Sequence, residues 1–96
     1  MQLIPVDHHI ARPIAGKRIF NDAEKEIMHI KLQKGEVVKE HDSPKHVFIF
    51  VNSGEVEFTV GDEKHIISKE RVLYMEPLER HALKALTDVS ILVMKC

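Results

Sequence analysis

The chain has 96 residues, 14 of them basic and 15 acidic, with a formal net charge of −1, and residues 1–96 fit a single domain. Its hydrophobic fraction of 44% and charged fraction of 30% are typical of a folded globular protein and exclude a disordered one. No run of basic residues predicts a surface for nucleic acid or anionic membranes, and no apolar stretch is long enough to span a bilayer, so we expect neither partner.

Residues 1–20 are predicted to form an N-terminal arm with short strands. The first ten residues lack the apolar core of a signal peptide. His8 and His9 are adjacent on this arm, and we expect both to be solvated, because chain ends make few packing contacts.

Residues 23–32 allow two interpretations. Asp22 could cap a helix that carries apolar residues along one face. From residue 28 onward, however, apolar and polar side chains alternate, which favours a strand with one buried and one wet face. In that strand His29 lies on the wet face.

The run VFIFV at residues 47–51 is apolar on both of its faces. Alternation along a strand places Val47, Ile49 and Val51 on one face and the two phenylalanines on the other. This pattern predicts a central strand that is covered on both sides. Because a short chain has a small core, we expect a homodimer that buries the outer apolar face.

The remaining runs complete a series of short strands. Residues 55–68 are predicted to form a hairpin that turns at Gly61-Asp62, with His65 on its polar face. Three further runs follow, RVLYM, HALKAL and SILVM. Many short strands with Gly and Asp turns predict an all-β protein, a small antiparallel barrel or sandwich. The one cysteine, Cys96, fits a reducing compartment, so we expect a cytoplasmic location.

The glycines and histidines of the central region have a recognisable spacing. Five residues separate Gly35 from His41, and Gly54 follows downstream. This pattern resembles the first motif of the cupin family, G-x5-H-x-H-x(3,4)-E-x6-G, and residues 71–83 resemble its second motif, G-x5-P-x-G-x2-H-x3-N. The resemblance covers residues 28–95. It implies a small single-domain cupin, whose jelly-roll barrel (a double-stranded β-helix) is often dimeric.

The resemblance also implies a position for a metal. In cupins, two histidines and a glutamate of the first motif and a histidine of the second bind a divalent ion such as Fe, Mn, Ni or Zn. His41 matches the first ligand position and His81 the last. Ser43 stands at the position of the second histidine, and Val47 at that of the glutamate. Half of the usual ligand set is replaced, so the pattern is compatible with a divalent metal or with no cofactor.

The expected ligand pocket is lined by His41, Ser43, Val47, Ile49 and His81. Val47 makes it more apolar than the pocket of a metal-binding cupin. We therefore favour a non-catalytic or sensory protein that binds a small organic molecule, with the two histidines as polar anchors. The alternative is a metal-dependent enzyme of the oxygenase or isomerase type. The sequence leaves open whether the protein is an enzyme.

A metal site in this pocket would need further ligands. His46 is a weaker candidate, because alternation along the strand turns it away from the face of Val47 unless a bulge intervenes. Glu76 or Glu79 could supply a carboxylate from the loop before His81, although a solvated turn is the simpler interpretation.

Overall fold

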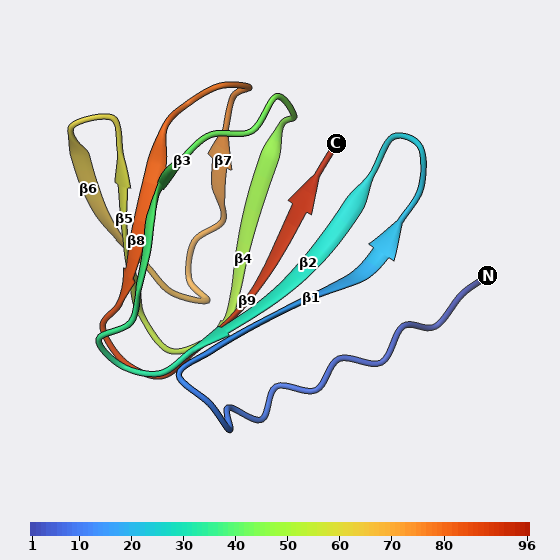
Figure 1. The fold of residues 1–96 in the computed structure, drawn as a ribbon, viewed down its shortest axis with the longest axis horizontal. Helices are drawn as coiled ribbons and strands as arrows, with labels where there is room; N and C mark the ends of the chain where they lie inside the picture. Colours follow the sequence, from blue (N-terminus) through green and yellow to red (C-terminus); the bar gives the residue numbers. More distant parts are fainter.

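The structure is a computed structural model that describes all 96 residues, and it contains nine strands and no helix. The strands are β1 (Ile14–Asn21), β2 (Glu26–Leu32), β3 (Val37–His41), β4 (Val47–Ser53), β5 (Val56–Val60), β6 (Glu63–Ile67), β7 (Leu73–Met75), β8 (His81–Ala85) and β9 (Val89–Lys95). They form a five-stranded sheet in the order β1-β2-β9-β4-β7 and a four-stranded sheet in the order β3-β8-β5-β6. The two antiparallel sheets face each other (Figure 1), which confirms the predicted all-β class. No helix is present that could cross a membrane.

The turn between β1 and β2 decides between the two interpretations of residues 23–32. Asp22 Oδ1 accepts hydrogen bonds from the main-chain N–H groups of Glu24 (2.8 Å) and Lys25 (2.7 Å). These bonds lower the pKa of the Asp22 carboxyl to about 2. The side chain thus closes a tight turn, and the helix interpretation is wrong, because β2 begins directly afterwards.

Strand β4 shows the predicted alternation but not the predicted cover. Val47, Ile49 and Val51 are buried between the sheets, whereas Phe48 is half-buried and Phe50 is 39% exposed. The expectation that this strand is covered on both sides is therefore wrong within one chain. Its outer face is open.

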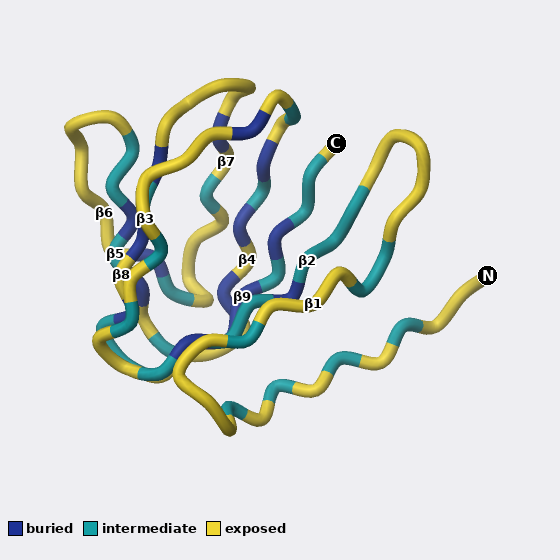
Figure 2. Tube along the Cα trace, in the orientation of Figure 1, coloured by how far each residue is buried: buried dark blue, intermediate teal, exposed yellow.

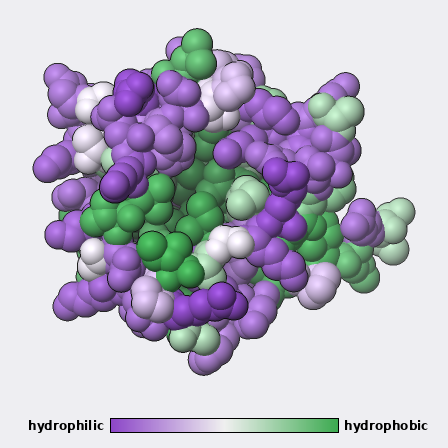
Figure 3. Space-filling model, in the orientation of Figure 1, coloured by the Kyte–Doolittle hydropathy of each residue, from purple (hydrophilic) through white to green (hydrophobic).

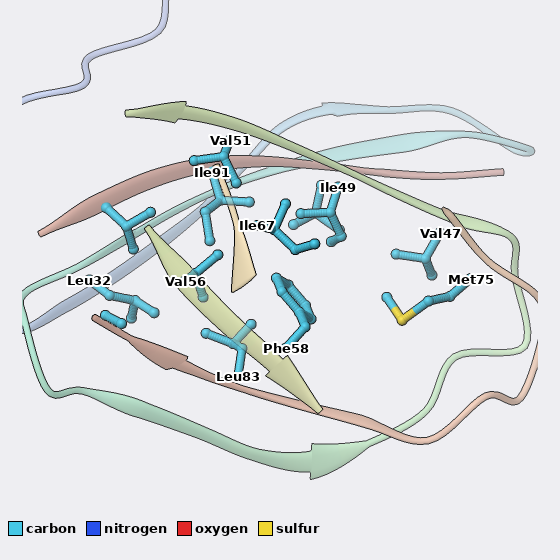
Figure 4. Packing of buried hydrophobic residues seen from close by; sticks show 13 residues of the cluster. Leu32, Val47, Ile49, Val51, Val56, Phe58, Ile67, Met75, Leu83 and Ile91 are labelled. Carbon is cyan, nitrogen blue, oxygen red and sulfur yellow. The ribbon is translucent and has the colours of Figure 1, made fainter. Parts of the chain in front are cut away.

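Apolar side chains from both sheets meet in a cluster of 13 buried residues (Figure 4). At one end of the barrel the register places Leu32 opposite Val89 and Val51 opposite Ile91, and all four side chains are buried. Phe58, fully buried, lies in the middle of the cluster. Burying one such side chain contributes about 1.5–3 kcal/mol to stability, so this end holds the sheets together.

The arm of residues 1–12 covers part of the outer side of the five-stranded sheet. His8 Nδ1 and His29 Nε2 each lie 2.7 Å from the Ser90 hydroxyl oxygen, and the two rings meet edge-on with centroids 5.1 Å apart. His29 is buried beneath the arm, and this burial, followed by the charge of His8, lowers its pKa. The predictions that His8 is solvated and that His29 is on a wet face are wrong, because the arm itself replaces the solvent there.

Gly54 links β4 to β5 in a left-handed conformation, with φ of 84°. A Cβ at this position would lie 2.1 Å from the carbonyl oxygen of Asp88 and 2.7 Å from Thr87 Oγ1. Gly61, in the β5–β6 turn, also has a positive φ of 61°, but no atom lies within 4 Å of its hypothetical Cβ. Gly54 therefore meets two constraints, and Gly61 only one.

Replacement of Gly54 by alanine should destabilise the protein more than replacement of Gly61. A left-handed backbone alone costs alanine about 1–2 kcal/mol, so we expect that loss for Gly61→Ala. For Gly54→Ala we expect a loss of about 3 kcal/mol or more, because the main chain at Asp88 must also move. Urea unfolding at neutral pH measures both values. Equal losses would show that the close approach of Asp88 imposes no constraint.

Candidate functional site

A cavity of about 110 Å³ lies between the sheets, toward the end opposite the closed core. Its lining consists of 11 residues: Met28, Ile30, Val38, His41, Val47, Ile49, Phe58, His81, Leu83, Val93 and Lys95. Eight of these are hydrophobic, and the polar ones are His41, His81 and Lys95. Figure 3 shows apolar side chains gathered in a hollow between the two sheets, surrounded by polar ones.

His41 and His81 face each other across β3 and β8. The register pairs Val38 with Leu83 and His41 with His81, so β3 contains one residue more than β8 over this stretch. This β-bulge changes the alternation along β3. Without it, Glu40 would stand opposite His81, and His41 would point away from the cavity.

The hydrogen bonds of the two imidazoles determine which ring nitrogen is free. The ring centroids are 4.3 Å apart at an interplanar angle of 62°. Nδ1 of His41 lies 2.9 Å from the carbonyl oxygen of Lys39, and Nδ1 of His81 lies 3.0 Å from that of Glu79. A carbonyl oxygen can only accept a hydrogen bond, so each Nδ1 carries a proton and each neutral ring keeps a lone pair on Nε2.

Both Nε2 atoms are available to a ligand. Neither has a hydrogen-bond partner in the chain, and no unpartnered side-chain nitrogen or oxygen is fully buried. The Nε2 of His81 is therefore not completely buried, although the residue as a whole is only 5% exposed. His41 is exposed and forms the outer rim.

The environment of the inner imidazole favours its neutral form. Burial lowers the pKa of His81, the hydrogen bond to Glu79 opposes this decrease, and the charge of His41 adds to it. The Lys95 ammonium is the one cation of the lining, and its Nζ lies 3.7 Å from Glu26 Oε1. The lining of the cavity thus contains no acidic side chain, and the ammonium of its one lysine is paired with Glu26.

Four other residues were predicted to line or complete this pocket, and one of them, Val47, is buried in its lining. Ile49 is part of the lining and is buried. Ser43 is buried in the turn before β4, where its Oγ accepts a hydrogen bond from the Lys45 N–H (3.2 Å), and it does not reach the cavity. His46 lies on the outer side of the sheet, where its Nδ1 is 2.6 Å from the Tyr74 hydroxyl oxygen.

The side chains at the cavity supply fewer ligands than a protein-bound metal ion usually has. Glu79, one of the two loop carboxylates considered, accepts a hydrogen bond from the Glu76 N–H through Oε2 (2.7 Å) and is exposed. No group of three His, Cys, Asp or Glu side chains that could hold a metal occurs anywhere in the structure. The chain therefore offers a metal two imidazole nitrogens, fewer than the three or four protein ligands typical of such sites.

Lys95 and several apolar lining residues were not singled out from the sequence. Met28 and Ile30 follow the alternation of β2, so the pattern that predicted their burial could also have placed them in the cavity. Lys95 is in phase with Val93 along β9, which would have turned it inward. A lysine at the end of a strand gives no local sign of facing a cavity, since its long side chain usually reaches solvent.

Comparison with known protein families gives one match. The family described as Cupin domain matches residues 28–95, which is most of the chain. A comparison with curated proteins gives no match.

Solved structures with the same fold are numerous but distant in sequence. A cupin family protein with a double-stranded β-helix fold from Methanocaldococcus jannaschii is 19% identical, with a TM-score of 0.88 over 100% of this chain and 90% of that one. A cupin protein from Desulfovibrio desulfuricans is 20% identical, with a TM-score of 0.87 over 100% and 96%. KdgF from Halomonas sp. is 20% identical, with a TM-score of 0.79 over 98% and 94%. At these identities the likeness shows the fold alone.

The pKa of His81 should lie below the ordinary histidine value of 6.5, and His41→Ala should move it back toward that value. The substitution removes a like charge and part of the cover over the ring, and both changes favour the protonated form. Because the folded state disfavours protonation of His81, this residue should also make the protein less stable as the pH falls below 6.5. NMR titration of the imidazole Cε1–H signal measures the shift, with His65→Ala as a control at an exposed site. A pKa above the ordinary value in the unmodified protein would contradict the proposed burial.

Proposed function

We propose that this chain, which belongs to the cupin domain family, binds a small organic molecule in its barrel cavity in a non-catalytic or sensory role. One observation carries the proposal: two imidazoles present unpaired Nε2 lone pairs at a cavity whose other walls are almost entirely apolar. Such a combination of an apolar cavity and a few convergent polar groups is typical of small-molecule sites.

The cavity restricts the size of the proposed ligand. Its volume of about 110 Å³ equals about four times the share of one molecule in liquid water, so only a compound of a few heavy atoms fits inside. An apolar part of the ligand would contact Ile30 and Ile49, and a larger ligand would have to extend past His41 at the rim.

The polar groups indicate which functional groups the ligand should carry. A neutral imidazole Nε2 accepts a hydrogen bond, so a hydroxyl group suits His41 and His81. The Lys95 ammonium, which is paired with Glu26 at 3.7 Å, can also bind an anionic group of the ligand. A short hydroxy acid has both features and an apolar carbon chain. We therefore propose this chemical class.

A metal-dependent enzyme of the oxygenase or isomerase type is the second candidate. It is favoured by the Nδ1–H bonds of both histidines to main-chain carbonyls, an arrangement that commonly orients imidazoles for metal binding through Nε2. His41 and His81 would hold the ion, and water or substrate would have to supply the other ligands. A divalent ion in this position would act as a Lewis acid toward a bound substrate.

Binding of a short hydroxy acid should change the NMR signal of the Met28 methyl group and leave that of Met94 unchanged. Met28 lines the cavity, whereas Met94 is on the opposite face of the same sheet and serves as an internal reference. The measurement is a titration of methyl-13C-methionine protein with lactate, compared with propionate, which lacks the hydroxyl group. Lactate should bind more tightly. The effect should be lost in His41→Ala and His81→Ala but kept in His65→Ala. Equal binding of the two acids would contradict a hydrogen bond to the imidazoles.

Elemental analysis separates the two candidate functions. If the ligand is organic, protein purified without added metal should contain well below one equivalent of any transition metal, and EDTA should leave the lactate titration unchanged. Close to one equivalent of metal, lost in His41→Ala and His81→Ala and kept in His65→Ala, would favour the metal enzyme and reject the organic-ligand site in its present form.

A further inference from the structure

A second cavity lies between the N-terminal arm and the β1–β2 hairpin, and we propose that it binds a small organic anion with a phosphate or carboxylate group. Its volume is about 410 Å³, and arm, β1 and β2 all contribute to its lining. Cavities of this size commonly hold small molecules. We call it the arm cavity, and its charged and titratable lining residues are Asp7, Arg12, Lys17, His29 and Lys31.

The arm cavity and the barrel cavity lie on opposite faces of the five-stranded sheet. His29 of β2 lines the arm cavity, whereas its neighbours Met28 and Ile30 line the barrel cavity. Side chains alternate between the two faces of a strand, so this division follows from the sequence. The strand register places Lys17 of β1 opposite His29, on the outer face. The present proposal therefore does not depend on the proposed function.

Hydrogen bonds hold the arm in place over the sheet. Lys31 Nζ donates to the main-chain carbonyl oxygens of Asp7 (2.9 Å) and His9 (2.6 Å), and His8 Nδ1 lies 2.7 Å from the Ser90 hydroxyl oxygen. The arm is extended, and its burial alternates from residue to residue (Figure 2). The wall that the arm gives to the cavity is thus fixed by bonds to β2 and β9.

The lining of the arm cavity has an excess of positive charge. Its one carboxylate, that of Asp7, already accepts a hydrogen bond from the His9 N–H (3.0 Å), and it is outnumbered by three cations, Arg12, Lys17 and Lys31. Neither Arg12 nor Lys17 forms an ion pair. An ammonium has three donors and Lys31 uses two of them on the arm, so one N–H is left. In a chain with a net charge of −1, this local excess of cations attracts an anion.

His29 adds a ring nitrogen without a partner. Its Nε2 lies 2.7 Å from the Ser90 hydroxyl oxygen, and its Nδ1 has no hydrogen-bond partner in the chain. The residue is only 5% exposed, yet no unpartnered side-chain nitrogen is fully buried, so Nδ1 is not completely covered. Polar atoms in such enclosed positions normally have a partner. An imidazole that carries a proton on Nδ1 can donate a hydrogen bond to an anion.

A bound anion should therefore raise the pKa of His29. Burial lowers this pKa, the charges of His8 and Lys31 add to the decrease, and the charge of Asp7 opposes it. The other charged side chains of the lining are Arg12 and Lys17. An anion in the arm cavity adds a negative charge beside the ring, which favours its protonated form.

The remaining lining favours an organic anion over an inorganic one. Four of the 11 lining residues are hydrophobic, among them Val6 of the arm and Ile14 and Ile19 of β1. A carbon skeleton can pack against these side chains, while its anionic group contacts the cations. Apolar walls with a few convergent polar groups are typical of sites for small organic molecules.

The test is an NMR titration of the His29 Cε1–H signal with phenyl phosphate and with succinate, at about pH 8 and constant ionic strength. Binding should shift this signal and leave that of His81, in the barrel cavity, unchanged. Arg12→Ala and Lys17→Ala should each raise the dissociation constant about fivefold, the effect of losing one exposed charge pair. The matched control is Lys64→Ala, which removes the same charge from an exposed strand position of the other sheet and should leave the dissociation constant within about twofold.

Binding of either compound with this pattern of variants supports the proposal, and the one that binds more tightly distinguishes a phosphate from a carboxylate ligand. In saturating ligand, the pKa of His29 should also rise. The proposal is overturned if neither compound shifts the His29 signal. It is also overturned if Lys64→Ala weakens binding as much as Lys17→Ala, because binding would then reflect only the net charge. A shift confined to His81 would place the ligand in the barrel cavity and reject the arm cavity as its site.

Discussion

The candidate site depends on one extra residue in β3. Strict alternation from Val38 would turn Glu40 toward the cavity, and its carboxylate would then face His81. The bulge instead turns His41 inward, so that two imidazoles meet in place of an acid and a base. The absence of an acidic group opposite His81 follows from this change of register, and so does the proposed preference for a ligand that donates a hydrogen bond.

The buried cluster and the cavity share side chains. Val47 and Ile49 belong both to the buried cluster and to the cavity lining. A glutamate in place of Val47, as the family motif has it, would bury a carboxylate, which is costly unless a metal or another cation accompanies it. Valine avoids this cost and leaves the cavity apolar. Val47 therefore packs in the core and offers no ligand atom to a metal.

Local patterns in the sequence predicted much of the fold. Alternation identifies β2, β4 and the β5–β6 hairpin, and the spacing of the family motif predicts that His41 and His81 share one pocket. The bulge was not predicted for His41, because the rule of alternation assumes an unbroken ladder. Contacts between distant segments were also missed: the arm brings His8 to His29 and Ser90, and nothing in the residues around position 29 shows that an arm will cover it.

The direct test of the central claim is the protonation state of the two imidazoles at a pH where both are neutral. Long-range 1H–15N correlation spectra of the histidine side chains distinguish a protonated from an unprotonated ring nitrogen. The structure predicts a proton on Nδ1 and a lone pair on Nε2 for both His41 and His81. A proton on Nε2 of either ring would contradict the account, because that nitrogen could then neither accept a ligand hydroxyl nor bind a metal.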